Sequence, residues 1–364
     1  MDLVFLIIVF FIISSIAGNP DYSNRSLSVE TTTNLQIIAV IFVIMHHLSQ
    51  ILRDYPDSFL SSRLIIAGRL AVGLFFFVSG YGLIKQFKQK GKSYLETFFK
   101  KKGMSVLIPF LLAMVVYFVY RNLIGELNFY TAMYSLVNGN PFVGNGWFTI
   151  MIIYLYAAFF ISAYLSKEND LFLFLMLIVS VIIGILIASL LNYGEWWTNA
   201  VFCFPLGVIW GAKEYGITSF LFKGYRISLG VLAVLFSFSL YVDEVFYHPI
   251  IRAISVLLFV LLIVLCSYKV TFQSPAYNLL KKFSFELYLY QGLFIQLFRS
   301  EIVFIGNRLL YVCAVILATK KVPASKASKD SAQQLILQDL SCAHARWEST
   351  GHWAGKASTH LTGK

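Results

Sequence analysis

Long apolar runs make up most of the chain, and this repetition limits its fold more than any other feature. An α-helix of about 20 apolar residues is long enough to cross the roughly 30 Å hydrocarbon layer of a membrane. Ten runs follow one another, mostly with short connections: 35–52, 64–84, 104–120, 147–165, 171–191, 199–211, 227–241, 250–268, 283–298 and 302–318. The sequence therefore predicts an all-α integral membrane protein with about ten transmembrane helices. The sixth and seventh runs are short, so they could be tilted, broken or misplaced by several residues.

Composition supports a membrane protein over other classes. Hydrophobic types make up 58% of the 364 residues and charged types only 13%, about half the usual share in a soluble domain. Such a chain has too much apolar surface to be disordered. Cys203, Cys266 and Cys313 lie inside apolar runs and Cys342 lies in a polar stretch. This distribution is not typical of a secreted disulfide framework.

Lys and Arg are unevenly distributed among the connections, and this bias predicts the orientation. The connection 85–103 carries seven lysines against one acidic residue, Glu96. Cytoplasmic loops are enriched in Lys and Arg, so we place this loop inside, and alternation then assigns every other connection. Fifteen Lys and Arg then lie inside and seven outside. This pattern accounts for the net charge of +11 better than a nucleic-acid surface does, so we expect no nucleic-acid partner.

The two ends of the chain differ from the part between them. Residues 3–17 are either a signal-peptide core cleaved after Ala17 or an extra uncleaved helix. The predicted orientation favours the helix, with Met1 outside, because a cleaved chain would begin on the wrong side for the first run. We divide the chain into an N-terminal apolar segment with a linker (1–33), a membrane domain (34–318) and a polar basic tail, disordered or out of frame (319–364).

Two adjacent histidines, His46 and His47, lie inside the first of the ten runs. Ionisable side chains are costly in a membrane and are a first indication of function, although a neutral histidine can also bond a neighbouring helix. Gln36 and His47 are eleven residues apart, so they share a helix face about 16 Å apart along the axis, whereas His46 points about 80° away. An imidazole is suited to act as a general base near neutral pH.

The second run combines small residues with an arginine. Gly80 and Gly82 allow neighbouring helices to approach closely, and Ser79 is a small polar group beside them. Arg69 lies near the outer end, at a depth similar to that of His47 if the first two helices pack together. It either lines the same passage or extends to the outer membrane surface.

The lysine-rich connection after the second run has two explanations. Its charges set the topology and attract anionic lipid. They also suit a cytoplasmic dock for a polyphosphate cofactor, because an ammonium group is a common phosphate partner. The candidates for that role are Lys85, Lys100, Lys101 and Lys102.

The ninth run is too polar to contact lipid alone. It contains Glu286, Tyr288 and Gln291, so we expect it to face a protein interior or a wet cavity. Trp147 opens the fourth run after the segment 144–146. An indole at that position is usually an interfacial anchor, and here it is also a candidate for the acceptor side of a passage.

These motifs, in this order, resemble the acyltransferase-3 family of integral-membrane O-acyltransferases. The matching segments are LQIIAVIFVIMHH, GRLAVGLFFFVSGYGL, the basic loop ending in LIPF, NGWFTIMIIYLYA and FSFELYLYQG, and they extend from about 34 to 318. The family includes many bacterial enzymes that acetylate sugars of surface polysaccharides. The resemblance implies about ten helices, an acyl-CoA donor on the cytoplasmic side and an acceptor modified at or beyond the membrane.

The resemblance also implies roles for individual residues. The family has a histidine thought to be essential at the position of His47, and an arginine eleven residues earlier, where this chain has Gln36. Gln291 stands where histidine is common, and the basic loop has lysine in place of the usual arginine. Glutamine keeps hydrogen bonding and loses the charge, which leaves open an altered or weakened activity.

The combined prediction is a multi-pass enzyme of the plasma membrane that moves an acyl group, expected to be acetyl, from acyl-CoA to a hydroxyl of a sugar or cell-surface polysaccharide. His47, with His46 and Gln36, would perform the proton transfer, and the four lysines would hold CoA. The passage would be formed by Arg69, Ser79, Tyr81, Trp147, Glu286, Tyr288 and Gln291. Acetyl-CoA is then a co-substrate, with no resident cofactor and no metal required.

Two alternatives stay open. Buried polar helices also mark transport paths, so the chain could be a transporter or flippase of a polar or lipid-linked sugar. It could also be a catalytically inactive member of the family. The acceptor, the acyl length and the oligomeric state are not predicted.

Overall fold

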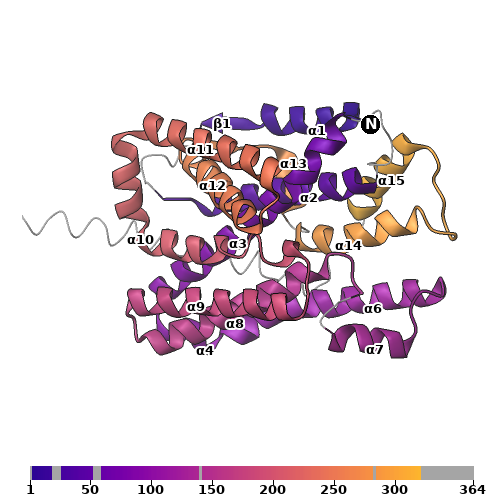
Figure 1. Cartoon of the computed structure of the whole chain (residues 1–364), viewed down its shortest axis with the longest axis horizontal. Coiled ribbons are helices and arrows are strands. Elements are labelled where there is room, and N and C mark those ends of the chain that lie inside the picture. Colours follow the sequence, from indigo (N-terminus) through magenta and orange to yellow (C-terminus); the bar gives the residue numbers. More distant parts are fainter. Residues whose placement is uncertain (1, 19–25, 52–58, 139–141, 282–283, 321–364) are drawn as a thin grey trace, which may run out of the picture.

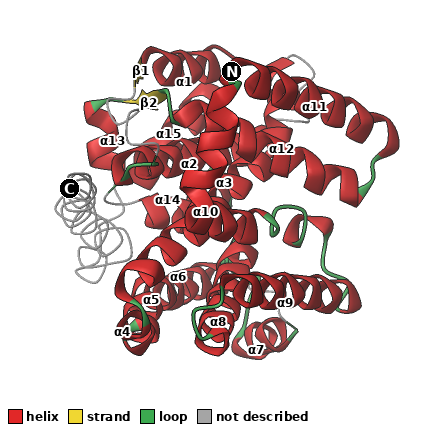
Figure 2. Ribbon diagram, turned by 90° about the vertical axis from the view of Figure 1, so that its left-hand side faces the viewer, coloured by secondary structure: helices red, strands yellow, loops and turns green. Residues whose placement is uncertain are grey.

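Helices form nearly all of the computed structural model, which describes residues 2–18, 26–51, 59–138, 142–281 and 284–320 (Figures 1 and 2). The longer helices are α1 (Asp2–Ser14), α2 (Val29–Ile51), α3 (Phe59–Lys90), α6 (Ile108–Leu123), α7 (Phe129–Val137), α8 (Gly146–Ser166), α9 (Asp170–Leu190), α10 (Cys203–Lys223), α11 (Tyr225–Phe246), α12 (Pro249–Ser267), α14 (Ser284–Leu297) and α15 (Arg308–Lys320). The short elements are β1 (Ile16–Gly18), α4 (Lys92–Glu96), α5 (Phe98–Lys102), the π-helix η2 (Gly103–Leu107), the 3-10 helix η3 (Glu195–Trp197), β2 (Val270–Phe272) and α13 (Pro275–Leu280).

The predicted all-α membrane class is confirmed. A helix lies at each of the ten apolar runs, and among the described residues seven are long and apolar enough to cross a membrane by length and composition: 29–51, 64–90, 98–123, 146–166, 170–190, 225–246 and 249–267. The helices α10, α14 and α15 are broken or short, so the count of ten spans stays a prediction. Most of the predicted tail, from 321 onward, lies outside the described residues.

The helix at the N-terminus packs antiparallel to α2. Phe5 is buried beside Met45 and Leu48, near the end of α2, whereas Ile12 is buried beside Ile37 and Ile38, near its start. After α1 the chain forms β1, which pairs antiparallel with β2. The stretch predicted as an extra helix or a signal is therefore helical here, and the question of its cleavage stays open.

Ion pairs join helix ends that the predicted alternation places on the same side. Asp170, at the start of α9, pairs with Lys88 near the end of α3 and with Lys213 in α10. The start of α1, helix α7 and the connection between α14 and α15 all lie at the opposite end of the molecule (Figure 1). The arrangement agrees with alternating helices, and which end faces the cytoplasm stays a prediction.

Several elements differ from the predicted runs. The connection 121–146 contains α7, whose start is fixed by a capping box in which Asn128 and Thr131 exchange hydrogen bonds. The last run was predicted to begin at 302, but α15 begins at Arg308, because the residues before it form a turn with a bridge between Arg299 and Phe304. The predicted sixth run is wrong in its bounds, since α10 continues to Lys223 through a break.

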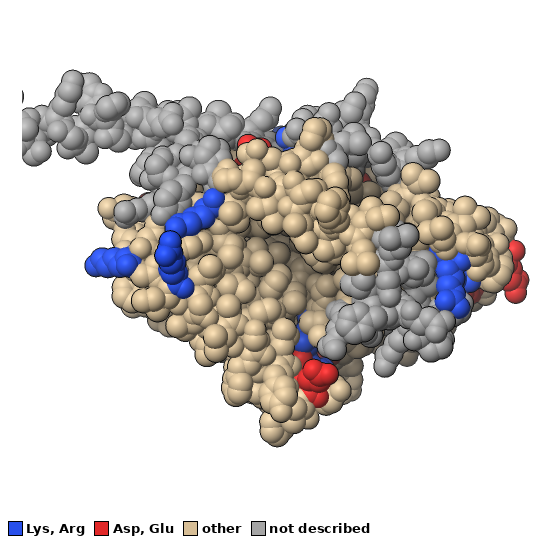
Figure 3. Space-filling model, turned by 90° about the horizontal axis from the view of Figure 1, so that it is seen from above, with Lys and Arg blue, Asp and Glu red and all other residues tan. Residues whose placement is uncertain are grey.

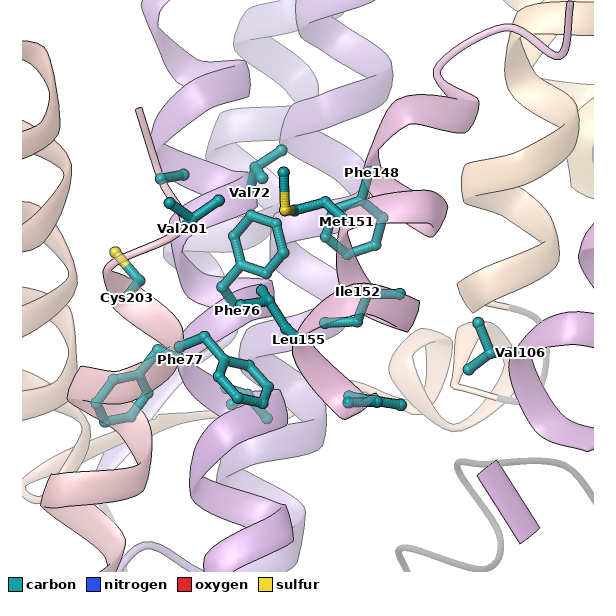
Figure 4. Packing of buried hydrophobic residues seen from close by; sticks show 14 of the residues in the cluster. Val72, Phe76, Phe77, Val106, Phe148, Met151, Ile152, Leu155, Val201 and Cys203 are labelled. Atoms are coloured by element: carbon teal, nitrogen blue, oxygen red, sulfur yellow. The ribbon is translucent and has the colours of Figure 1, made fainter. Parts of the chain in front are cut away.

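The tightest packing in the core lies between α3 and α10. A Cβ atom built on Gly80 would lie 2.2 Å from the Phe204 carbonyl oxygen, and one on Gly207 would lie 2.1 Å from the Phe77 carbonyl oxygen. Figure 4 shows Phe76 and Phe77 of α3 filling the space between this contact and Met151 and Leu155 of α8. Because glycine has no Cβ atom, the backbones of α3 and α10 can touch here, as they do at many contacts between membrane helices.

The surface is largely apolar. Figure 3 shows one face on which only a few Lys, Arg, Asp and Glu side chains are visible. Helix α11 is a clear example, because its side chains Val234, Phe238 and Tyr241 are exposed. Such a surface needs lipid as its solvent.

Candidate functional site

The predicted histidine pair lies near the C-terminal end of α2, against α3. The His46 ring fits over Gly68 so closely that a Cβ on this glycine would lie 2.4 Å from the imidazole. Its Nδ1 lies 3.4 Å from the Leu64 carbonyl oxygen. The first two helices therefore pack together, as the depth argument required, and His46 is the member of the pair that touches α3.

His47 has a different environment. Its ring is half-buried, meets the His46 ring edge-on with centroids 4.8 Å apart, and places Nδ1 3.1 Å from Oε1 of Gln50. This contact is compatible with the tautomer in which Nδ1 carries the hydrogen and Nε2 keeps a lone pair. That is the tautomer a general base requires if Nε2 is the reacting atom.

Gln36 lies on the same uninterrupted helix, α2, and is half-buried. The continuity of α2 supports the premise that Gln36 and His47 share a face. Helix α14 packs along α2, with Ile295 buried beside Met45 and Leu48. The polar ninth run therefore lies beside the histidine helix.

Arg69 is engaged with partners that sequence reasoning did not identify. Its guanidinium binds Asp243 of α11 at 2.5 Å, and Arg252 of α12 binds the same carboxylate at 3.0 Å and also pairs with Glu195. The Nε atom of Arg69 is buried and has no hydrogen-bond partner among the residues that the structure describes. Arg69 thus ties α3 to the α11–α12 hairpin one residue after the glycine that holds His46.

Glu214 of α10 is the centre of the most extensive polar network among the described residues, although sequence reasoning missed it. Its carboxylate is only 4% exposed and pairs with Lys85 at 2.5 Å. The hydroxyls of Tyr81 and Tyr268 donate to it, and so do the Leu27 backbone N–H and the Ser26 hydroxyl. The only signal was an acidic residue directly after Lys213 at the end of a short run.

In this network Lys85 and Tyr81 bind Glu214, whereas Lys85 was predicted to bind CoA and Tyr81 to line the passage. The Lys85 ammonium also lies 5.3 Å from the centre of the Tyr81 ring, and its side chain is 29% exposed. A lysine whose charge is balanced by a buried carboxylate attracts phosphate less than an unbalanced one. Both residues lie at the end of α3 that carries the basic connection.

The remaining loop lysines point in different directions. Lys100 is exposed and Lys101 half-buried, whereas Lys102 is buried, with its ammonium 6.0 Å from the centre of the Tyr156 ring of α8. The Tyr156 hydroxyl also lies close to Ser79 of α3. Ser79 and Lys102, predicted for different roles, therefore meet at one tyrosine.

The polar residues of α14 meet the start of α8. The Tyr288 hydroxyl donates to the Asn145 carbonyl oxygen at 3.0 Å, and its ring contacts Phe148. Gln291 is fully buried; its Nε2 donates to the Tyr288 carbonyl, while its Oε1 finds no partner within the described part of the chain. Asn145 itself has a left-handed backbone with φ 63°, which turns the chain into α8.

Trp147 and Glu286 complete the predicted set. The Trp147 ring is half-buried and packs against Trp197 with centroids 6.1 Å apart. Glu286 is buried in the first turn of α14. The structure thus gathers Trp147, Tyr288 and Gln291 around the α8–α14 contact, and it places the histidine pair on the neighbouring α2.

Comparison with known proteins identifies the family. A family model described as an acyltransferase domain matches residues 33–319. Comparison with curated proteins and comparison with solved structures gave no match. The matched segment contains most of α2 and continues through almost all of α15, and it includes every candidate residue predicted from the sequence. The chain therefore belongs to the acyltransferase-3 family of membrane acyltransferases.

Proposed function

We propose that the protein transfers an acetyl group from acetyl-CoA to a hydroxyl of a sugar or cell-surface polysaccharide at the plasma membrane. Family membership supports acyl transfer, and the observation that carries the mechanism is the position of His47, on α2 beside the polar helix α14, with Nδ1 3.1 Å from Oε1 of Gln50. In the proposed tautomer, Nδ1–H donates to Gln50, which leaves Nε2 able to accept a proton.

In the proposed reaction, Nε2 of His47 accepts the proton of the acceptor hydroxyl as the oxygen attacks the thioester carbonyl. The C–S bond then breaks, and the sulfur leaves with its electron pair. The imidazolium returns the proton to the CoA thiolate, which restores the neutral histidine. His46, held against Gly68, positions its neighbour in this scheme.

The donor is proposed to enter from the end that carries the basic connection. Lys100 and Lys101 extend outward there, and Lys102 lies behind them over Tyr156. Lys85 is coupled to Glu214, so we assign it a supporting role in the same region. The thioester would reach His47 along the Gln36 face of α2, beside the polar helix α14.

The acceptor is proposed to approach from the opposite end, where Arg69, Trp147, Tyr288 and Gln291 lie. Indole rings and buried amides are common partners of sugar rings and hydroxyls. Ser79, Tyr81 and Glu286 would shape the passage farther in.

The decisive test replaces one histidine at a time. Purified protein is incubated with radiolabelled acetyl-CoA and candidate glycans, and labelled glycan is counted. His47→Ala should lower the rate by about 10²–10⁴-fold, the usual contribution of a general base, while acetyl-CoA binding persists. His46→Ala should lower it less, and Gln36→Arg should preserve or raise it.

Each other outcome has a distinct meaning. If His47→Ala transfers at the parent rate, the mechanism is wrong. If His46→Ala alone abolishes transfer, His46 is the base. If neither the parent nor Gln36→Arg transfers label to any glycan, the protein is better explained as a transporter or an inactive family member.

A further inference from the structure

Helix α10 breaks at a lysine and changes direction. Lys213 has φ −114° and ψ 18°, outside the helical range, between two helical halves. Figure 1 shows the second half turned across the direction of the other helices, and Figure 2 shows it lying in front of them at the end of the molecule. This half, residues 214–223, therefore follows the end of the bundle instead of continuing through it.

A shallow, open groove runs along one side of this second half, and the described residues that line it all belong to α10. It has a volume of about 580 Å³, and its walls include Lys213, Tyr215, Gly216, Phe220 and Leu221. Tyr215 and Phe220 are 73% and 74% exposed. Aromatic side chains on a helix that lies across the bundle end are typical of a membrane–water interface, where rings contact acyl chains and polar atoms meet headgroups.

The charge at the head of the groove is positive. Lys213, whose side chain is 58% exposed, lies 3.2 Å from one oxygen of Asp170, and Lys88 binds the other oxygen. Two ammonium groups therefore share one carboxylate, which leaves one positive charge uncompensated within this trio. Lys213 is thus a cation at the mouth of an apolar groove, which is complementary to an anionic headgroup with an acyl chain attached.

We propose that this groove binds an anionic phospholipid, with the phosphate on Lys213 and Lys88 and one acyl chain along Phe220 and Leu221. Lys213, at the break, lines the groove while its ammonium contacts Asp170, and Gly216 leaves the space open, since a Cβ there would meet nothing within 4 Å. This inference does not depend on the identity of the acyl donor or acceptor.

The test compares lipids on the full-length protein. The protein is taken into detergent, mixed with phosphatidylglycerol or phosphatidylcholine, and the retained lipid is counted by native mass spectrometry. Phosphatidylglycerol should be retained preferentially, and Lys213→Gln should weaken its binding roughly fivefold, the equivalent of about 1 kcal/mol per basic residue at a lipid surface.

Two further variants distinguish the contribution of the lysine charge to lipid binding from that of the groove's shape. Lys167→Gln removes an exposed lysine from the connection before α9, outside the groove, and should leave the preference unchanged. Gly216→Leu keeps the charges and fills the open space, so it should lower retention of both lipids. Thermal unfolding of each variant confirms that it is folded.

Three results would overturn the proposal. The first is an unchanged phosphatidylglycerol preference in Lys213→Gln. The second is equal stabilisation by inorganic phosphate, which would make this a free-phosphate site. The third is displacement of the lipid by acetyl-CoA at concentrations that saturate the enzyme, which would assign the groove to the donor.

Discussion

Glu214 illustrates how a single residue can organise one end of this protein. A buried carboxylate is costly unless charged and polar partners surround it. Here a lysine, two tyrosines and the backbone before α2 provide those partners, and Trp210 donates to the Tyr268 hydroxyl at 2.9 Å. The network therefore joins α3, α10, α12 and the segment that leads into α2.

Replacing this carboxylate should weaken the fold strongly. Glu214→Gln removes the charge opposite Lys85 and should lower the free energy of unfolding by about 3 kcal/mol. The matched control is Glu126→Gln, because Glu126 is exposed and pairs only with Arg121 among the contacts described for it; an exposed pair contributes less than about 1 kcal/mol. Thermal unfolding in detergent, followed by tryptophan fluorescence, measures both. Equal shifts for the two variants would contradict the assignment.

The candidate residues could be predicted from the sequence, but their partners could not. Histidines, lysines and glutamines stand out inside apolar runs because each is costly there. Which helices touch is not encoded in the spacing of one run, so Arg69 was not connected with Asp243, nor Lys85 with Glu214. Ser79 and Lys102 likewise meet only because α8 places Tyr156 between them.

Among the elements, the α3–α10 contact has the strictest steric requirement. Gly207 and Gly211 of α10 are four residues apart, so they lie on one face, and both would collide with α3 if they had a Cβ. Gly80 is their counterpart on α3. Gly82, although predicted to have the same role, faces open space, since a Cβ there would meet nothing within 4 Å.

This difference predicts opposite effects for two similar substitutions. Gly80→Ala must push α3 away from the Phe204 carbonyl and should lower the free energy of unfolding by about 3 kcal/mol. Gly82→Ala adds a methyl group to open space and should be neutral or stabilising by up to about 1 kcal/mol. The thermal unfolding midpoint of each variant is the measurement. A loss of stability in Gly82→Ala as large as in Gly80→Ala would show that the close contact is not the cause.

The helices themselves followed from the apolar runs, and the departures have local causes. Helix α7 was not predicted because a nine-residue helix is too short to produce a spanning run, and its signal is the capping pair of Asn128 and Thr131. The break at Lys213 is not marked by proline, so hydropathy gave only a short run there. The pairing of β1 with β2 joins parts of the chain that no local pattern relates.

For the whole molecule, the distribution of charge and the packing of helix ends predict the same topology. The connection 85–103 and residue Asn138 should lie on opposite sides of the membrane. Single cysteines at Lys90 and Asn138 in a cysteine-free variant should react differently with an impermeant maleimide in intact cells: Asn138→Cys labelled, Lys90→Cys not. Permeabilised cells, in which both should react, provide the control. The reverse pattern in intact cells would invert the topology.

The pairing of β1 with β2 also has a consequence for the order of folding during synthesis. Ala17 leaves the ribosome before its partner Thr271, which follows about 250 residues later. At the usual 5–20 residues per second of translation, the first strand waits on the order of 10–50 s for its partner. During that interval α1 is held by the bilayer and by its packing against α2. The β1–β2 sheet is therefore completed only after the helices from α2 to α12 have been synthesised.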